Sequence, residues 1–379
     1  MTVYLDNAAT TSLDEEVLEA MLPYMTTLCG SPSAIHSYGR KAKVAVEKAR
    51  KQVAALLNAT PAEIFFTSGG TEGNNMALRS AAESLGICHV ITSPIEHLAV
   101  LQPLAHMAQS GQIQLYYVAL DDQGHVQYDH LERLLKSHEH SLVSLMHGNN
   151  EIGNLNDLVR IGALCQQYQA IFHTDAVQTL GHYKLDLHSL PVHLLVGSAH
   201  KLHGPKGIGL IYISNDIQIT PFIYGGAQER GMRGGTENVP AIMGLSKALE
   251  IAYRDMETNR PYIQGLKQQM IHNLRASIPS ISFYGDSADL AKSLYTLLSV
   301  SLPPAENHDM LLFNLDIHQI AASAGSACTS GSQKASHVME ALHVDPKRST
   351  IRFSLGKYNT AAEIDYAVEK LAELCAIHA

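Results

Sequence analysis

Residues 64–75 read Ile64-Phe-Phe-Thr-Ser-Gly-Gly-Thr-Glu-Gly-Asn-Asn75, an apolar run followed by a glycine-rich turn and then by the start of a helical pattern. The small residues of the turn let backbone amides approach an anion, and the N-terminus of the helix favours a phosphate group. The turn matches neither a Walker loop nor GxGxxG, so it does not specify a triphosphate or a dinucleotide. Taken alone, such a turn is more often only a tight connection between a strand and a helix.

The same strand-then-helix rhythm continues along the chain and predicts an α/β domain with a mostly parallel sheet. Short strand-like runs occupy 64–67, 89–92, 113–120, 142–146, 170–174, 193–196 and 208–213. Before them, 14–25 and 40–57 are expected to be helical, and Ser12-Leu-Asp-Glu15 suggests a capping box for the first helix. Functional sites of such domains lie at the carboxyl ends of the strands.

Beyond about residue 250 the pattern changes and predicts a smaller α+β domain. It comprises a long helical stretch, strands at 294–302 and 351–355, and a final helix opened by Thr360-Ala-Ala-Glu363. Pro240 and Pro261 are both plausible breaks near the boundary. The predicted division is 14–255 for the large domain and 1–13 with 256–379 for the small one.

The amino-acid composition argues against several classes of binding partner. The 379 residues carry 27 Lys and Arg against 36 Asp and Glu, a net charge of −9, which argues against electrostatic binding of nucleic acid. No run of about 18 apolar residues predicts a membrane helix, and the N-terminus lacks the features of a signal peptide. The 21 histidines form no metal-binding motif, so no metal site is expected. Five widely spaced cysteines fit a reduced, cytoplasmic protein.

Two further strand ends hold reactive side chains. Asp175 follows the apolar strand in Phe172-His-Thr-Asp-Ala-Val-Gln178, where a carboxylate needs a partner or serves only as a helix N-cap. Lys201 follows the next strand in Ser198-Ala-His-Lys201, where apolar surroundings favour the uncharged amine of a Schiff base. A phosphate cradle, a carboxylate and an amine are together what pyridoxal 5'-phosphate requires.

With these residues the chain resembles the cysteine desulfurases of the NifS/IscS type, in the class V aminotransferase group of fold-type I pyridoxal-phosphate enzymes. The matching stretches are 4–11 (YLDNAATT), 66–72 (FTSGGTE), 96–97 (EH), 146–153 (MHGNNEIG), 173–178 (HTDAVQ), 198–201 (SAHK), 204–207 (GPKG), 229–237 (ERGMRGGTE), 325–329 (GSACT) and 351–356 (IRFSLG). They extend over nearly the whole chain. The resemblance implies a large domain with a mainly parallel seven-stranded sheet, a smaller domain, and a homodimer with shared active sites.

The resemblance also implies roles for individual residues. Lys201 would bind the cofactor covalently and move protons at the substrate carbon, and Asp175 would keep the pyridinium nitrogen protonated. His97 would stack on the ring and shuttle protons. The remaining cofactor contacts are Asn150 and Gln178 at the ring substituents and, at the phosphate, Gly70, Thr71, Ser198 and His200, with Thr236 from the second subunit. Arg352, assisted by Asn150, would bind the substrate carboxylate, for which arginine is suited.

Cys328 separates a desulfurase from an ordinary aminotransferase. It lies among small residues in Ala324-Gly-Ser-Ala-Cys-Thr-Ser-Gly331, and the resemblance implies that its thiolate takes sulfur from L-cysteine, leaves L-alanine and passes the sulfur to an acceptor protein. A lone cysteine is otherwise usually an inert buried residue, which is our interpretation of Cys29, Cys88, Cys165 and Cys375.

Departures from the family keep alternatives open. Gly30-Ser-Pro-Ser-Ala34 stands where the family usually has Gly-Asn-Pro-Ser-Ser, close to the substrate. The sequence ends soon after the helix at 360–378, without the extension by which some members dock an iron–sulfur scaffold, so iron–sulfur assembly and thiolation both remain as pathways. A selenocysteine lyase, a class V aminotransferase or a non-catalytic scaffold would share much of the same pattern.

Overall fold

The computed structural model describes residues 1–304, 310–324 and 336–377. Its centre is a seven-stranded sheet in the order β2-β8-β7-β6-β5-β3-β4. All neighbours are parallel except β8, which runs antiparallel to both β2 and β7. The strands are β2 (Ile64–Thr67), β3 (His89–Thr92), β4 (Gln114–Tyr117), β5 (Ser141–Ser144), β6 (Ile171–Asp175), β7 (Leu194–Ser198) and β8 (Gly209–Ile213). The predicted α/β fold is confirmed, with every expected strand displaced by no more than three residues at either end.

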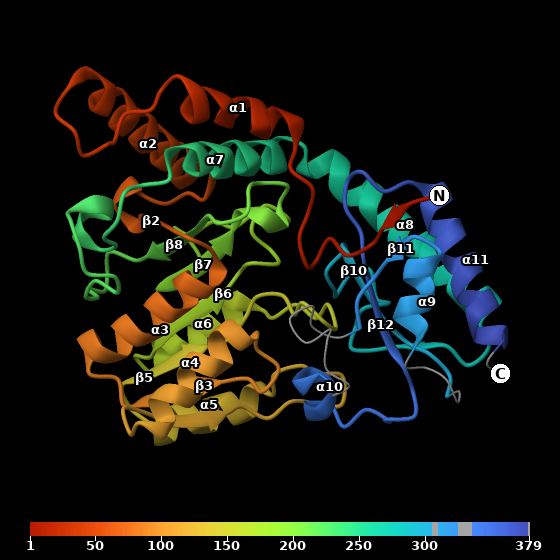
Figure 1. Cartoon of the computed structure of the whole chain (residues 1–379). Coiled ribbons are helices and arrows are strands. Elements are labelled where there is room, and N and C mark those ends of the chain that lie inside the picture. The colour runs from red at the N-terminus through yellow and green to blue at the C-terminus, as the bar shows by residue number, and fades with distance from the viewer. Residues whose placement is uncertain (305–309, 325–335, 378–379) are drawn as a thin grey trace.

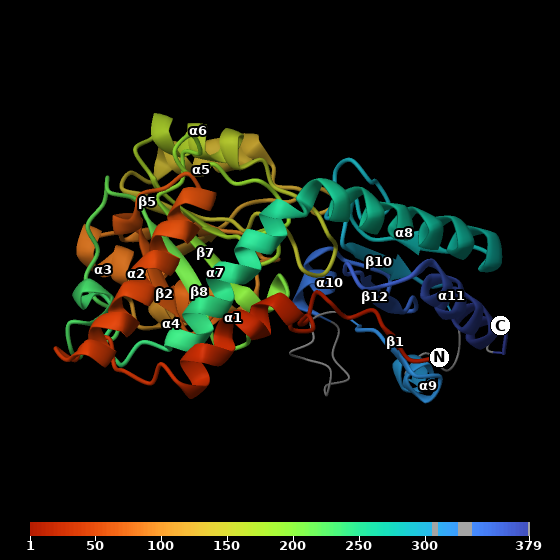
Figure 2. The same cartoon turned by 90° about the horizontal axis from the view of Figure 1, so that it is seen from above.

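Helices cover both faces of this sheet (Figures 1 and 2). They are α1 (Glu15–Thr26), α2 (Ser37–Leu56), α3 (Gly70–Leu85), α4 (Leu98–Gln109), α5 (Tyr128–Ser137), α6 (Leu158–Gln167) and α7 (Val239–Arg254). Helices α1 and α2 both pack on α7, and Figure 1 shows them on the opposite side of the strands from α3 and α4. The central strands β5 and β7 are buried throughout, as expected for a sheet covered on two sides.

The predicted capping box at Ser12 is wrong. Helix α1 begins at Glu15, and its N-cap is Asp14, whose carboxylate accepts a hydrogen bond from the Glu16 amide. Ser12 lies two residues too early, and its carbonyl accepts instead from the His203 ring. The expectation for the last helix is confirmed, because Thr360 and Glu363 exchange side-chain to backbone hydrogen bonds at its start.

The C-terminal third forms a second, smaller layer of helices and strands (Figure 1). Strands β9 (Ser282–Phe283), β10 (Leu297–Ser301) and β12 (Thr350–Ser354) pair antiparallel, and β1 (Val3–Tyr4) pairs with β11 (Ile320–Ala321). The helices are α8 (Met256–Ser277), α9 (Leu311–Ile317), α10 (His337–Ala341) and α11 (Ala361–Ile377). Val3 and Leu5 pack into the same apolar core as α8 and α11, so the first residues of the chain join its last.

Neither proline marks the break between α7 and α8. Pro240 lies in the first turn of α7, where a missing amide hydrogen costs nothing, and Pro261 lies inside α8. The helices meet at Asp255, which is the C-cap of α7 and the N-cap of α8. In the part of the chain that the structure describes, no helix combines the length and apolar character needed to cross a bilayer.

Candidate active site

A cavity of about 250 Å³ lies at the carboxyl ends of β6 and β7. Ten of the residues expected from the sequence line it: Gly70, Thr71, His97, Asn150, Asp175, Gln178, Ser198, His200, Lys201 and Arg352. They come from segments far apart in the sequence, so the fold brings together what the motifs only suggested.

Lys201 is the last residue of a single 3-10 turn, Ala199–Lys201, that directly follows β7. Its side chain crosses to the N-terminal segment, where Nζ donates to the carbonyl oxygens of Ala8 and Ala9, the second at 2.7 Å. The ammonium group is thus held at the boundary between the two layers of the molecule, on the wall of the cavity.

Asp175 ends β6 and is 5% exposed. Its Oδ2 accepts from Asn74 Nδ2 at 2.6 Å, and its Oδ1 accepts from the Val177 amide at 2.9 Å. No α-helix follows it, because residues 176–179 form turns, so it does not cap a helix. Two hydrogen-bond donors thus orient a carboxylate that faces the cavity. A buried charge requires such hydrogen-bonding partners.

A buried chain of polar groups continues behind Asp175, and the sequence motifs did not reveal it. Asn74 Oδ1 lies 3.1 Å from His173 Nε2, and His173 Nδ1 lies 2.9 Å from Ser144 Oγ. Burial lowers the pKa of His173 to about 3, so the ring is neutral, and the Nε2 proton donates to Asn74. Asn74 and His173 both stand in quoted motifs, but nothing in the one-dimensional pattern said that they would meet.

His97 lies across the cavity at the start of α4, where its Nδ1 accepts from the Ala99 amide at 3.1 Å. That bond fixes the ring and leaves Nε2 as the position for a proton. Burial is the main cause that lowers the pKa of His97, with the Lys201 charge adding to it and the Asp175 charge opposing it. A neutral imidazole facing a reaction site can accept a proton.

The N-terminus of α3 lies at one end of the cavity, where the free amides of a helix start are suited to an anion. Gly70 lies in its first turn, against Val177, where an added Cβ would lie only 2.8 Å from Cγ2. Thr71, Ser198 and His200 line the cavity beside it. Burial and the nearby Lys201 and Lys206 charges lower the pKa of His200 to about 4, so His200 can offer only a neutral N–H.

Arg352 is 2% exposed and already has protein partners. Its Nη2 donates to Asp6 Oδ1 at 2.8 Å, and its Nη1 donates to the Asn150 carbonyl at 2.9 Å. Asp6 belongs to a quoted motif, but the motif gave it no role. Gln178 likewise donates to the Ala8 carbonyl at 3.0 Å, so both side chains are oriented by the N-terminal segment.

Two expected residues are not part of this cluster. Thr236 is exposed and does not line the cavity, and Cys328 falls outside the described residues. Among the other cysteines, Cys165 is buried, which raises the pKa of its thiol, and Cys375 is half-buried with its pKa raised to about 11. The expectation that Cys29 and Cys88 are buried is wrong, because both are exposed.

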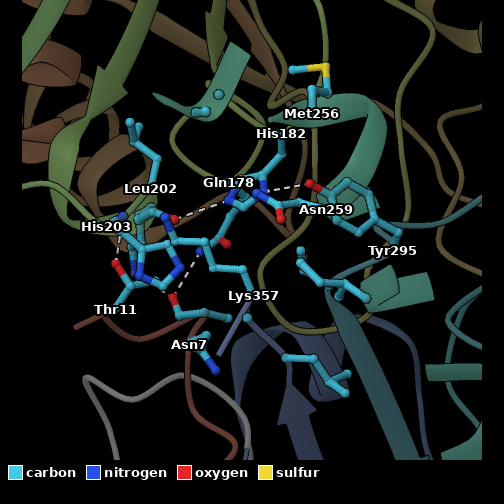
Figure 3. A pocket seen from close by; sticks show the side chains of 18 of the residues that line it. Asn7, Thr11, Gln178, His182, Leu202, His203, Met256, Asn259, Tyr295 and Lys357 are labelled. Carbon is cyan, nitrogen blue, oxygen red and sulfur yellow. Dashed lines mark hydrogen bonds between the residues drawn. The ribbon is translucent and has the colours of Figure 1, made fainter. Parts of the chain in front are cut away.

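A second, smaller cavity of about 50 Å³ is also lined in part by Lys201, and Figure 3 shows others of its lining residues, among them Gln178, His182 and Tyr295. It shares Ala8, Gln178 and Lys201 with the first cavity. Residues of α7, α8 and the approach to β10 complete its wall, among them Ile251, Met256 and Tyr295. Lys201 therefore lines both cavities, at the boundary between the two layers of the molecule.

Comparison with known proteins agrees with this geometry. The model of the class-V aminotransferase family matches residues 3–367. The chain belongs to the class-V aminotransferase family. It is 39% identical over 376 residues to the cysteine desulfurase IscS of Dictyoglomus turgidum. The aligned region covers 98% of this chain and 94% of that protein.

Solved structures give the same result. A NifS-like protein is 36% identical, covers both chains completely and superposes with a TM-score of 0.91. SspA in complex with cysteine is 31% identical, with a TM-score of 0.81 over 95% of this chain and all of that one. Family members depend on pyridoxal phosphate. In this chain an amine, an oriented carboxylate and a helix N-terminus surround one cavity, a donor set that fits that cofactor.

Proposed function

We propose that the chain is a cysteine desulfurase that removes sulfur from L-cysteine and leaves L-alanine. The observation that carries the proposal is the convergence of Lys201, Asp175 and His97 on one cavity in a chain whose sequence also holds Cys328. One relative described above is named a cysteine desulfurase and aligns over 98% of this chain, and a structural neighbour was solved in complex with cysteine.

Each part of pyridoxal phosphate would be bound by different residues. The phosphate would be bound by Gly70, Thr71, Ser198 and His200, and the ring nitrogen by Asp175. Asn150 and Gln178 lie at the ring substituents, and Lys201 supplies the amine. When bound, the cofactor supplies an electron sink for the bond that breaks at the substrate α-carbon. Arg352 binds the substrate carboxylate, and the exposed Thr236 reaches the phosphate of a second copy in a homodimer.

Lys201 and His97 move protons, and Cys328 takes the sulfur. Lys201 removes the proton at the α-carbon, because its side chain lines the cavity in which the substrate would lie. The Cys328 thiolate then attacks the substrate sulfur, so that an S–S bond forms as the C–S bond breaks. The electron pair of the C–S bond stays with carbon, which takes up a proton to become alanine, and the persulfide sulfur passes to an acceptor thiol.

The test is the release of alanine and sulfide from L-cysteine in the presence of a reductant. The wild type is expected to be active, and both Lys201→Ala and Cys328→Ser are expected to lose at least about 100-fold in rate, as is typical when a nucleophile or base is removed. Cys88→Ser is the matched control, since Cys88 is exposed, and it should keep wild-type activity.

Each other outcome favours a different function. Full alanine production by Cys328→Ser would point to a lyase of the selenocysteine type. A wild type that binds the cofactor but releases no alanine would leave an aminotransferase, and a wild type that binds no cofactor would leave a scaffold protein.

A further inference from the structure

His182 lines the second cavity, close to Tyr295 (Figure 3), and its ring also contacts the main chain of Lys201. Its Nε2 is 3.0 Å from the Lys201 carbonyl oxygen, and its Nδ1 is 2.9 Å from the Tyr295 hydroxyl oxygen. A carbonyl can only accept, so Nε2 carries the proton, and the neutral ring must then accept the Tyr295 O–H at Nδ1. Burial lowers the pKa of His182, which favours this neutral form.

The Lys201 carbonyl needs an outside partner. Lys201 ends a one-turn helix, and the last carbonyl oxygens of a helix find no amide donor within that helix. Gly181 makes the approach possible, because its φ of +79° turns the chain and an added Cβ would lie 3.2 Å from Leu202 and from Ala252. The turn aims His182 at the main chain of the lysine.

Tyr295 belongs to the other layer of the molecule. It is 4% exposed and lies in the apolar core formed by α8, β10 and β12. Its ring packs against Tyr183, and the Arg260 guanidinium of α8 lies over both rings, 5.2 Å from Tyr183 and 5.9 Å from Tyr295. Tyr295 therefore connects the apolar core of the smaller domain with Tyr183 and His182.

The geometry points to His182 as a positioning residue of Lys201. Through its two hydrogen bonds, His182 links the main chain of Lys201 to Tyr295 in the smaller domain. The inference rests on the proposed function only in that Lys201 carries the cofactor. The Lys201 side chain extends from this main chain to the wall of the cavity, so a shift of the backbone changes where Nζ can lie in the cavity.

The experiment has two readouts on the holoenzyme. The first is the rate at which the cofactor moves from Lys201 to the amine of added L-alanine, which is recorded as a change in absorbance. The second is the pH at the midpoint of the titration of the holoenzyme absorbance. His182→Leu removes both hydrogen bonds and is expected to slow exchange roughly five- to tenfold and to shift the midpoint, as the loss of a buried hydrogen bond implies. Tyr295→Phe, which keeps the ring, should slow exchange about two- to fivefold. His182→Gln can still donate and accept, so it should restore most of the rate.

Two matched controls separate positioning from general stability. His125 Nε2 also joins the two layers, through Asp286 Oδ2 at 2.9 Å, but away from Lys201. Tyr366 donates to the His318 carbonyl within the smaller domain. His125→Leu and Tyr366→Phe should leave the exchange rate within about twofold, the size of effect expected for remote substitutions.

The inference is overturned if His182→Leu and Tyr295→Phe leave both readouts unchanged, or if His125→Leu changes them equally. Should His182→Leu fail to fold, Tyr295→Phe and His182→Gln still decide. Exchange with alanine needs neither Cys328 nor sulfur, so a wild type that exchanges normally but releases no alanine from cysteine contradicts the proposed function alone. A wild type that takes up no cofactor contradicts both.

Discussion

Asp175 shows how single residues prepare the cavity for a cationic ring. Its two oxygens are each held by one N–H donor, from Asn74 and Val177, and these two hydrogen bonds fix the orientation of the carboxylate. Asn74 is itself held by the neutral His173. The charge is thus oriented by Asn74 and Val177, which also line the cavity, and behind them by His173, which does not.

Replacing Asn74 tests this arrangement. In Asn74→Ala the carboxylate loses one donor, and a hydrogen bond to a charged group is worth about 1.5–3 kcal/mol. We expect the dissociation constant for pyridoxal phosphate to rise by roughly tenfold or more, measured by fluorescence titration of the cofactor-free protein. Asn273→Ala is the control, because Asn273 also donates to a carboxylate, that of Asp365, on an exposed surface. An affinity within twofold of wild type would contradict the role of Asn74.

At the scale of elements, α3 is decisive because it carries the anion-binding end of the cavity and packs directly on β7. Gly73 marks the closest approach, since an added Cβ would lie 2.7 Å from Val196 Cγ1. Val196 is a fully buried strand residue, and its branched side chain is stiff, so it cannot move aside cheaply.

Gly73→Ala is therefore expected to destabilise the protein although alanine favours helices. Overpacking costs about 1–3 kcal/mol, and the gain in helix propensity returns at most about 1 kcal/mol, which leaves a net loss of up to about 2 kcal/mol. Gly265→Ala in α8 is the control, because nothing lies within 4 Å of its added Cβ, and it should stabilise slightly. Chemical denaturation measures both, and adding Val196→Ala should recover part of the loss in Gly73→Ala.

Elements and motifs could be predicted because they are local. The apolar runs located the seven strands, and the strand ends located Asp175 and Lys201, since a parallel sheet gathers its carboxyl ends on one edge. What could not be predicted depends on distant partners. Asp6 meets Arg352 across 346 positions of the chain, and no spacing rule connects Asn74 with His173. The cap at Asp14 was missed because Ser12 offered an equally good sequence pattern.

At the scale of the whole molecule, the N-terminal segment joins the two layers. Its carbonyls at Ala8 and Ala9 hold Lys201, while Val3 and Leu5 lie in the apolar core of α8 and α11. This is the basis on which we propose the division into 14–255 and 1–13 with 256–379. The cofactor cavity then lies at the boundary, where a small displacement between the domains changes the site.

Buried neutral histidines give the folded protein a specific dependence on pH. Burial is the main cause that lowers the pKa values of His147, His200 and His203 to about 4, and that of His173 to about 3. In the unfolded chain these groups titrate near 6.5. Between about pH 6.5 and 4 the unfolded state therefore binds more protons than the folded state, so the free energy of unfolding falls as the pH is lowered through this window.

His147 allows the contribution of one such group to be measured, because its Nδ1 is buried without a hydrogen-bond partner. Each histidine that is protonated only in the unfolded chain contributes a slope of up to about 1.4 kcal/mol per pH unit. His147→Leu should reduce the slope of the unfolding free energy between pH 6.5 and 4.5 by about that amount, measured by urea denaturation of the cofactor-free protein at several pH values. His188→Leu is the control, since His188 is exposed. An unchanged slope in His147→Leu would mean that His147 takes up its proton as readily in the folded protein as in the unfolded chain, in which case its burial does not control the acid sensitivity of the fold.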